Sequence, residues 1–315
     1  MDVSEARPAL LGAIGSTPVV QLRRLAGSDS GEVWLKLEST NPTGSYKDRM
    51  ALAMIEGAER SGRLQPGQPV VEYSGGSTGS SLAFVCAVKG YPLRIVTSDA
   101  FSPEKLETME AFGAQLEILP SPEGITADLI PRMMERAAEI VGEVDGYPTD
   151  QFNNTDMIDG YDELGSELAD QLDGRLEAFC AYVGTAGHFL GVTRALRRTI
   201  PDVHRAVIEP AESPVISEGR AGTHHIEGGG VGFWPPLLAE DDFDEVVAVP
   251  EAEAFATARR AAQLEGLLCG PSTGANIAVA LRLAERLGPG SRIATTNVDS
   301  GLRYLARGLE LELLG

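Results

Sequence analysis

One lysine stands where its amine could act as a nucleophile. Lys47 follows a Pro/Gly turn, Asn41 to Gly44, and precedes a run with helical spacing, Arg49 to Glu59. The positive end of a helix dipole disfavours an ammonium group, and nucleophilic or Schiff-base chemistry needs a neutral amine. A solvated lysine in the first turn of a helix explains this segment alone equally well.

A second candidate site is the turn Gly184 to His188 (sequence GTAGH), which joins an apolar run to a helical run. Backbone N–H groups at such a turn lie at the positive end of the helix dipole and can bind a phosphate. The turn lacks the G-x-G-x-x-G pattern and its acidic ribose partner, which argues against NAD. An ordinary strand-to-helix turn is the structural alternative.

Two further turns are rich in glycine and hydroxyl residues. Glu72 to Ser80 lies between an expected strand and an expected helix, and its N–H and O–H donors could bind a carboxylate without a cation. Gly270 to Ala275 opens a helix that contains Ala278 to Leu287. Ser272 or Thr273 would be a good N-cap there, so this turn has a purely structural alternative.

Composition limits the possible classes of partner. A chain of 315 residues suggests about two domains, and a hydrophobic content of 43% is normal for a soluble α/β enzyme. The formal net charge of −20 would repel nucleic acids and acidic membranes. Any anionic ligand must therefore be held by local backbone donors.

Cysteine and histidine usage indicates a reducing compartment and no metal. Cys86, Cys180 and Cys269 lie far apart, which favours buried apolar roles over disulfides. Four scattered histidines argue against a metal site. The N-terminus does not resemble a signal peptide and no run reaches the ~18 apolar residues of a membrane span, so we expect a cytoplasmic protein.

Short apolar runs alternate with helical runs, which is typical of parallel α/β architecture. The strands expected are Val33 to Glu38, Pro69 to Tyr73, Leu93 to Thr97, Gln115 to Leu119, Ala178 to Val183, Ala206 to Glu209, Val246 to Val249 and Arg292 to Thr296. The helices expected, besides Arg49 to Glu59, are Ser81 to Lys89, Pro103 to Phe112, Thr126 to Val141, Phe189 to Arg198, Glu251 to Glu265, Gly274 to Leu287 and Gly301 to Glu310. We expect an α/β fold of two domains, each with a mainly parallel twisted sheet flanked by helices.

Two segments lack a clear period. A polar stretch, Asp145 to Asp156, is expected to cross between the domains. The Gly/Pro-rich segment from Pro210 to Asp244 is long enough that a functional or mobile role is expected.

The combination of one lysine, two anion-binding turns and a late serine at a helix start resembles a known family. Over essentially its whole length the chain is similar to cysteine synthase (O-acetylserine sulfhydrylase) and cystathionine β-synthase, pyridoxal phosphate enzymes of fold type II with a tryptophan synthase β-like fold. The segments that carry the resemblance are IGSTPVV, KLESTNPTGSYKDR, GTAG, EPAESPVISEG, IEGGGVGF, EGLLCGPSTGA and DSGLRYL.

The resemblance implies roles for residues on the cofactor side. Lys47 matches the Schiff-base lysine, which would also remove the substrate Cα proton. The residues matching the cofactor phosphate loop are Gly184, Thr185, Ala186, Gly187 and His188, with Ala186 in place of a common glycine. Ser272 matches the serine that contacts the pyridine nitrogen. A neutral hydroxyl leaves the ring a weak electron sink, which favours β-elimination to an aminoacrylate and addition of a nucleophile.

On the substrate side, Gln151 matches a glutamine that binds the substrate carboxylate. Gly228 and Gly230 match glycines that leave room for the substrate. The remaining substrate-binding residues implied are Ser74, Gly75, Gly76 and Thr78.

The loop from Ser74 to Gly79 departs from the family pattern T-S-G-N-T-G. Ser77 stands where the family has an asparagine that bonds the cofactor's 3′-oxygen. Gly75 stands where the family has a serine whose hydroxyl lies near the leaving group. These departures leave the leaving group and the nucleophile open.

The resemblance implies β-replacement on an O-acetylserine-like substrate, with sulfide giving L-cysteine. Alternatives are cystathionine synthesis from serine and homocysteine, breakdown of serine or cysteine, synthesis of another β-substituted alanine, or a non-catalytic homologue. Arg220 could select a phosphorylated serine, although a solvated loop charge is the simpler interpretation.

Domain borders and partners also follow from the resemblance. A smaller mobile domain that binds the substrate carboxylate is expected at 40–150, and a larger domain that binds the cofactor phosphate at 1–39 and 151–315. The expected assembly is a homodimer, and a serine acetyltransferase tail is a candidate partner.

Overall fold

The computed structural model describes residues 10–123, 126 and 128–305. The chain forms two compact units. Of the described residues, the first unit holds those up to Gly15 and those of Asn41–Gly160, and the second holds Ser16–Thr40 and those from Tyr161 onward. The prediction that the smaller domain moves stays a prediction.

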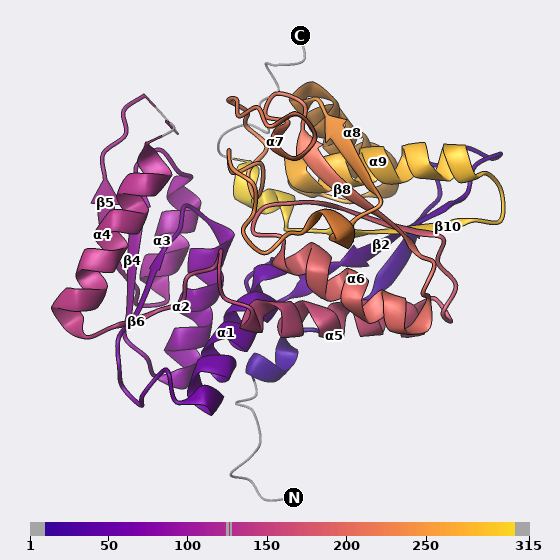
Figure 1. The fold of residues 1–315 in the computed structure, drawn as a ribbon. Coiled ribbons are helices and arrows are strands. Elements are labelled where there is room, and N and C mark those ends of the chain that lie inside the picture. Colours follow the sequence, from indigo (N-terminus) through magenta and orange to yellow (C-terminus); the bar gives the residue numbers. More distant parts are fainter. Residues whose placement is uncertain (1–9, 124–125, 127, 306–315) are drawn as a thin grey trace, which may run out of the picture. The chain divides into compact units, whose positions relative to one another are not determined.

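The first unit contains a four-stranded parallel sheet in the order β5-β4-β3-β6. Its strands are β3 (Val70–Tyr73), β4 (Leu93–Ser98), β5 (Gln115–Leu119) and β6 (Tyr147–Pro148). Its helices are α1 (Lys47–Ser61), α2 (Ser77–Lys89), α3 (Pro103–Ala111) and α4 (Leu129–Val144), with the short 3-10 helix η1 (Leu11–Ala13) before them (Figure 1). The central strand β3 is buried along its whole length, as expected for a parallel strand covered on both faces.

The second unit contains a six-stranded sheet in the order β1-β2-β10-β7-β8-β9. Its strands are β1 (Val19–Leu22), β2 (Glu32–Leu37), β7 (Ala178–Tyr182), β8 (His204–Pro210), β9 (Glu245–Val249) and β10 (Arg292–Asn297). Only the β1–β2 pair is antiparallel; the other four pairs are parallel. The helices are α6 (Gly187–Thr199), α7 (Val215–Glu218), α8 (Glu251–Glu265) and α9 (Pro271–Leu287), with 3-10 turns η2 (Glu38–Thr40), η3 (Glu240–Asp242) and η4 (Gly301–Tyr304). A further helix, α5 (Asp156–Gln171), begins in the first unit and continues in the second.

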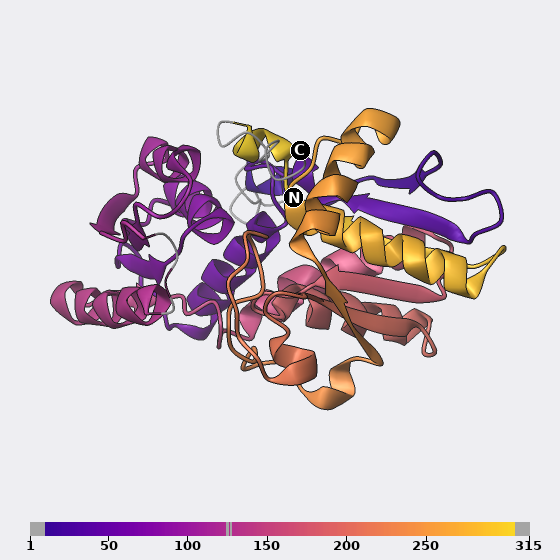
Figure 2. The ribbon, with the colours of Figure 1, turned by 90° about the horizontal axis from the view of Figure 1, so that it is seen from above.

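Side chains along β7 point alternately to the two faces of the second unit's sheet, and helices cover both faces. Cys180 and Tyr182 belong to a buried cluster with residues of α8 and α9, whereas Phe179 packs against Phe189 of α6 with ring centroids 6.3 Å apart. Figure 1 shows α8 and α9 on one side of this sheet and α6 on the other, and both views show α8 lying against α9 (Figures 1 and 2).

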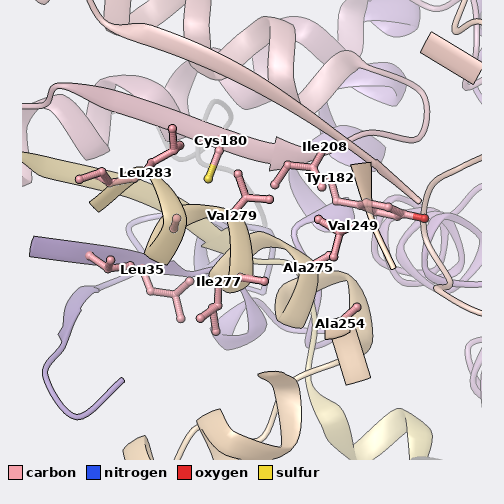
Figure 3. Packing of buried hydrophobic residues seen from close by; sticks show 14 of the residues in the cluster. Leu35, Cys180, Tyr182, Ile208, Val249, Ala254, Ala275, Ile277, Val279 and Leu283 are labelled. Atoms are coloured by element: carbon pink, nitrogen blue, oxygen red, sulfur yellow. The ribbon is translucent and has the colours of Figure 1, made fainter. Parts of the chain in front are cut away.

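The core of the second unit is centred on α9. Figure 3 shows Ile277 and Val279 of α9 among the side chains of Leu35, Cys180 and Ile208. Complete burial of each such aliphatic side chain contributes about 1.5–3 kcal/mol. The packing therefore holds α9, and with it the turn at the start of α9, firmly against the strands.

The predicted α/β fold with two mainly parallel sheets is confirmed. Strand β1 and helix α5 were not predicted, and the stretch Asp145 to Asp156 holds the edge strand β6 rather than only a crossover. Helix α5 was hidden by its glycines, which are poor helix formers. A β-carbon on Gly160 would lie 2.5 Å from the Arg49 carbonyl oxygen, and one on Gly165 would lie 2.5 Å from the Val192 carbonyl oxygen. Close backbone packing therefore requires glycine at both positions.

Several helix ends also differ from the prediction. Helices α2, α6 and α9 begin two to four residues earlier than expected, because glycine and hydroxyl residues predicted as loop form their first turns. The helix predicted from Gly301 is the 3-10 turn η4 up to Tyr304, and residues 306–310 of that prediction lie outside the described residues. In the long segment from Pro210 to Asp244, regular structure is limited to α7 and η3 after the end of β8.

All three cysteines are buried and unpaired by disulfides, as predicted. Burial raises the pKa of the Cys86, Cys180 and Cys269 thiols to about 12. No helix within the described residues is long and apolar enough to cross a membrane. Within the same residues, no group of three or more His, Cys, Asp or Glu side chains could hold a metal ion.

Candidate active site

Lys47 is the first residue of α1 and is only 6% exposed. Its backbone N–H donates to Ser45 Oγ at 3.3 Å, and its Nζ lies 4.7 Å from the centre of the Tyr46 ring. Burial of an amine is unfavourable unless it is neutral or well paired. The alternative of a solvated first-turn lysine is therefore wrong.

Asp48 fixes the turn that presents Lys47. Its carboxylate accepts the Thr43 N–H at 2.8 Å and the Thr43 hydroxyl at 2.5 Å. Gly44 has φ 75°, a conformation that favours glycine, and its N–H donates to the Asn41 carbonyl at 2.7 Å. The Pro/Gly turn is thus tied to the first turn of the lysine helix.

The predicted carboxylate loop lies at the carboxyl end of β3, as expected for a ligand site in a parallel sheet. Ser74 Oγ accepts the N–H of Gly76 at 3.2 Å and the N–H of Gly79 at 3.0 Å, which curls the loop. Gly75, Gly76 and Ser77 are half-buried, and α2 begins at Ser77.

Gln151 and Thr78, far apart in the sequence, meet in the first unit. Thr78 Oγ1 donates to Gln151 Oε1 at 2.8 Å, and Gln151 Nε2 donates to the Tyr73 carbonyl at 3.1 Å. The two predicted substrate-binding residues are therefore brought together beside the Ser74–Gly79 loop.

Glu72 is a buried carboxylate that sequence reasoning passed over. It accepts the Tyr73 N–H at 2.9 Å, the Thr149 hydroxyl at 2.7 Å and the Gln151 N–H at 3.3 Å. Burial raises its pKa to about 7, against these hydrogen bonds, which lower it. A charge inside the apolar run Val70–Tyr73 was the signal that could have identified it.

The predicted phosphate turn lies between β7 and α6 in the second unit, with Gly184, Thr185, Ala186, Gly187 and His188 all buried. Helix α6 starts at Gly187, so its first-turn amides face the turn. Ala186 is the N-cap residue at φ 69°, a left-handed conformation that costs an alanine about 1 kcal/mol. His188 Nε2 lies 3.1 Å from Thr296 Oγ1 on β10, which places the turn beside the end of that strand.

Ser272 lies in the first turn of α9, and its side chain is 1% exposed. Gly270 is the N-cap residue, so the alternative of Ser272 as N-cap is wrong. Ser272 Oγ has no hydrogen-bond partner among the described residues. A buried hydroxyl without a partner costs about 1–3 kcal/mol, so a bound group that supplies one would stabilise this position.

The glycine segment around Gly228 connects the phosphate turn to Ser272. A β-carbon on Gly184 would lie 2.6 Å from the Gly228 carbonyl oxygen, and one on Gly228 would lie 3.9 Å from Ser272 Oγ. The Gly230 N–H donates to the Val183 carbonyl at 3.1 Å. The amides at the start of α6 and an unsatisfied hydroxyl thus line one small-residue region, a donor set that fits a phosphorylated pyridine.

Asn276 fixes the helix that carries Ser272. Its Oδ1 accepts the Tyr182 N–H at 2.7 Å, and its Nδ2 donates to the Thr296 carbonyl at 2.8 Å. One buried side chain on α9 therefore links β7 and β10. Nothing in the local sequence distinguishes this asparagine, because its importance depends on both strands.

The predicted residues form two groups, one in each unit. Lys47, the Ser74–Gly79 loop and Gln151 belong to the first unit; the phosphate turn, Gly228 and Ser272 belong to the second. Arg220 is exposed and pairs with Glu218 at 3.1 Å, as expected of a solvated loop charge.

Comparison with known proteins points to one family. A family model described as "Pyridoxal-phosphate dependent enzyme" matches residues 10–299. The cysteine synthase of Staphylococcus aureus (strain Mu50 / ATCC 700699) is 39% identical over 295 residues, covering 93% of this chain and 94% of that protein.

Solved structures agree in fold along almost the whole chain. The crystal structure of O-ureido-L-serine synthase has a TM-score of 0.90 at 34% identity, covering 95% of this chain and 94% of that one. The O-acetylserine dependent cystathionine β-synthase from Helicobacter pylori has a TM-score of 0.89 at 33% identity, covering 96% and 98%. Since sequence, fold and the donor set of the second unit agree, the chain belongs to the family of pyridoxal-phosphate dependent enzymes, in the group that contains the cysteine synthases.

Proposed function

We propose that this enzyme replaces the β-substituent of an activated serine of the O-acetylserine type with sulfide and so makes L-cysteine. The observation that carries the proposal is the buried Ser272 hydroxyl without a partner among the described residues. A neutral hydroxyl beside a pyridine nitrogen favours loss of a β-substituent over transamination. The similarity to the Staphylococcus aureus cysteine synthase supports the same reaction type.

Each predicted residue has a task in this reaction. Pyridoxal phosphate, when bound, supplies the electron-withdrawing ring that makes the substrate Cα acidic. Lys47 would hold it covalently through Nζ and later take the Cα proton. The first-turn amides of α6 and Thr185 would bind its phosphate.

The substrate carboxylate would bind at the Ser74–Gly79 loop. Ser74 Oγ already accepts two loop amides, so its own O–H is a donor that can face a carboxylate. The Gln151 amide uses one hydrogen on the Tyr73 carbonyl, and its second hydrogen can serve the same carboxylate. Ser77, at the start of α2, would take the place of the family asparagine beside the cofactor.

A second candidate function is a related β-replacement or β-elimination. Two departures from the family pattern favour it: Gly75 near the leaving group and Ser77 beside the cofactor's 3′-oxygen. The products would be cystathionine, another β-substituted alanine, or the breakdown products of serine or cysteine. The homodimer, the serine acetyltransferase partner and the cytoplasmic location stay predictions.

Two measurements test the proposal. Borohydride reduction and peptide mapping should place a pyridoxyl label on Lys47. The variant Lys47→Ala should carry no label, and its turnover should fall at least about 10³-fold. Lys89→Ala, which removes a partly exposed amine paired with Glu59, should keep both.

Product identification then separates the candidates. The purified enzyme, given O-acetylserine with a panel of nucleophiles, should form cysteine fastest with sulfide. A dominant product from homocysteine, or release of pyruvate without a nucleophile, would favour the second candidate. A label on any residue other than Lys47 contradicts both.

A further inference from the structure

Three residues at and before α3 lie over the glycines of the Ser74–Gly79 loop. They are Phe101, in the turn before α3, and Lys105 and Met109, which are four residues apart on one face of α3. A β-carbon on Gly75 would lie 2.2 Å from Phe101 Cε1, and one on Gly79 would lie 2.7 Å from Met109 Sδ. The loop is therefore packed against α3 and the turn before it, which sequence reasoning did not connect with the loop.

The contact that a side chain at Gly75 would make differs from the one that a side chain at Gly76 would make. On Gly76 a β-carbon would meet the aliphatic chain of Lys105, with Cδ at 3.3 Å, a tight contact without overlap. On Gly75 it would overlap three ring atoms of Phe101, at 2.2–2.4 Å. Phe101 is 9% exposed and its N–H donates to the Ser98 carbonyl at 3.2 Å, so the ring sits in a packed turn. Any side chain at position 75 must displace this ring.

Position 75 is also the place where the family pattern has a serine hydroxyl near the leaving group. In this chain the apolar edge of the Phe101 ring occupies the space of that side chain. An aromatic edge favours an apolar group and offers no hydrogen bond to a free hydroxyl or a phosphate.

We propose that Phe101 is a specificity-determining residue, which makes the enzyme select a serine whose β-oxygen carries an acyl group over free serine and O-phosphoserine. The inference rests on the proposed β-replacement. Phe101 acts through the shape of the loop and through the apolar surface presented beside Gly75.

The test is a double-mutant cycle on the holoenzyme. Gly75→Ser should raise KM for O-acetylserine at least about 10-fold, because the new side chain collides with the ring. Phe101→Ala should lower the preference for O-acetylserine over serine by about 10-fold. The double variant, in which the new serine has room, should recover KM for O-acetylserine to within about threefold of wild type. Gly142→Ala on α4 is the control: a β-carbon there would have no neighbouring atom within 4 Å, so KM for O-acetylserine should stay within about threefold of wild type.

Further measurements distinguish a role of Phe101 in substrate selection from a merely structural role. KM for sulfide, the cofactor absorbance and the Lys47 label should be unchanged in Phe101→Ala and in the double variant. The free energy of unfolding, measured in urea for all four proteins, should show the same coupling between positions 75 and 101.

Three results would overturn the inference. One is a Gly75→Ser variant with wild-type kinetics, and another is a double variant whose defect is the product of the two single ones. The third is an unchanged preference for O-acetylserine in Phe101→Ala. A wild-type enzyme that lacks both the Lys47 label and turnover would overturn the proposed function and this inference together.

Discussion

The Ser272 hydroxyl is more useful to a ligand than to the fold. Its side chain is 1% exposed and its oxygen has no partner within the described part of the chain. The next residue is the opposite case, because Thr273 Oγ1 accepts the Val298 N–H at 2.9 Å. Of these two adjacent hydroxyls, that of Thr273 stabilises the fold, whereas that of Ser272 is left to bind a ligand.

Ser272→Ala should leave the cofactor-free protein as stable as wild type, or more stable by about 1 kcal/mol, because it removes an unsatisfied buried group. Added pyridoxal phosphate should stabilise this variant less than it stabilises wild type. Urea unfolding with and without the cofactor measures both effects. As a control, Thr273→Val should destabilise the cofactor-free protein by about 1–3 kcal/mol, since it leaves the Val298 N–H unpaired. Equal losses in the two variants would show that Ser272 is structural.

Glu72 should make stability depend on pH. Its pKa is raised by burial from 4.5 to about 7, so between these values the folded protein binds more protons than the unfolded chain. The stability that Glu72 contributes is therefore fully present below pH 4.5 and is lost as pH rises through about 7, by at most about 3 kcal/mol.

Glu72→Gln stays neutral throughout this range. Its free energy of unfolding, compared with wild type, should therefore rise as pH increases from 4.5 to 8. Urea unfolding at both pH values measures the change, and Glu139→Gln, which alters an exposed carboxylate paired with Arg136 on α4, serves as the control. A constant difference between Glu72→Gln and wild type would contradict the prediction.

At the scale of elements, α8 and α9 pack closely together at Gly274 of α9. A β-carbon on Gly274 would lie 2.0 Å from the Ala254 carbonyl oxygen and 2.9 Å from the Ala258 nitrogen. Backbone atoms cannot move aside as a flexible side chain can, so α8 and α9 would have to separate.

Gly274→Ala should therefore destabilise the protein by about 3 kcal/mol, and by shifting the start of α9 it should also weaken cofactor binding. Gly142→Ala on α4 is the matched control. A β-carbon on Gly142 would have no neighbouring atom within 4 Å, so this change should stabilise the protein by about 0.5–1 kcal/mol. Thermal unfolding of both variants gives the comparison, and similar melting temperatures would refute the packing argument.

Elements with a strong local pattern were predictable. Strand β5 and helix α8 have the bounds that periodicity predicts, Gln115–Leu119 and Glu251–Glu265. The starts of α2 and α9 were not predictable from the sequence. Ser77 and Ser272 are typical turn residues, and they become helical because their helices pack on the neighbouring strands. Helix α5 was missed for the same reason, since its glycines meet partners far away in the sequence.

At the scale of the molecule, the turns that carry the predicted site residues were evident as motifs, whereas the residues that support them were not. Phe101 and Asn276 act through partners that are distant in the sequence, and no local pattern marks them. Glu72 was marked only by its charge inside an apolar run. The net charge of −20 led to the expectation that anions are held by local backbone donors. The buried phosphate turn and the Ser74–Gly79 loop have that composition.

The position of β10 in the sheet has a consequence for biosynthesis. Residues 292–297 are among the last described in the chain, yet they pair with β2 on one side and β7 on the other. On a ribosome, the nascent chain through residue 160 already contains the complete sheet of the first unit, whereas the β1–β2 hairpin must wait for almost the entire polypeptide. During that interval the edges of β2 and β7 that β10 will cover have no partner, and unpaired strand edges favour wrong pairing with other chains.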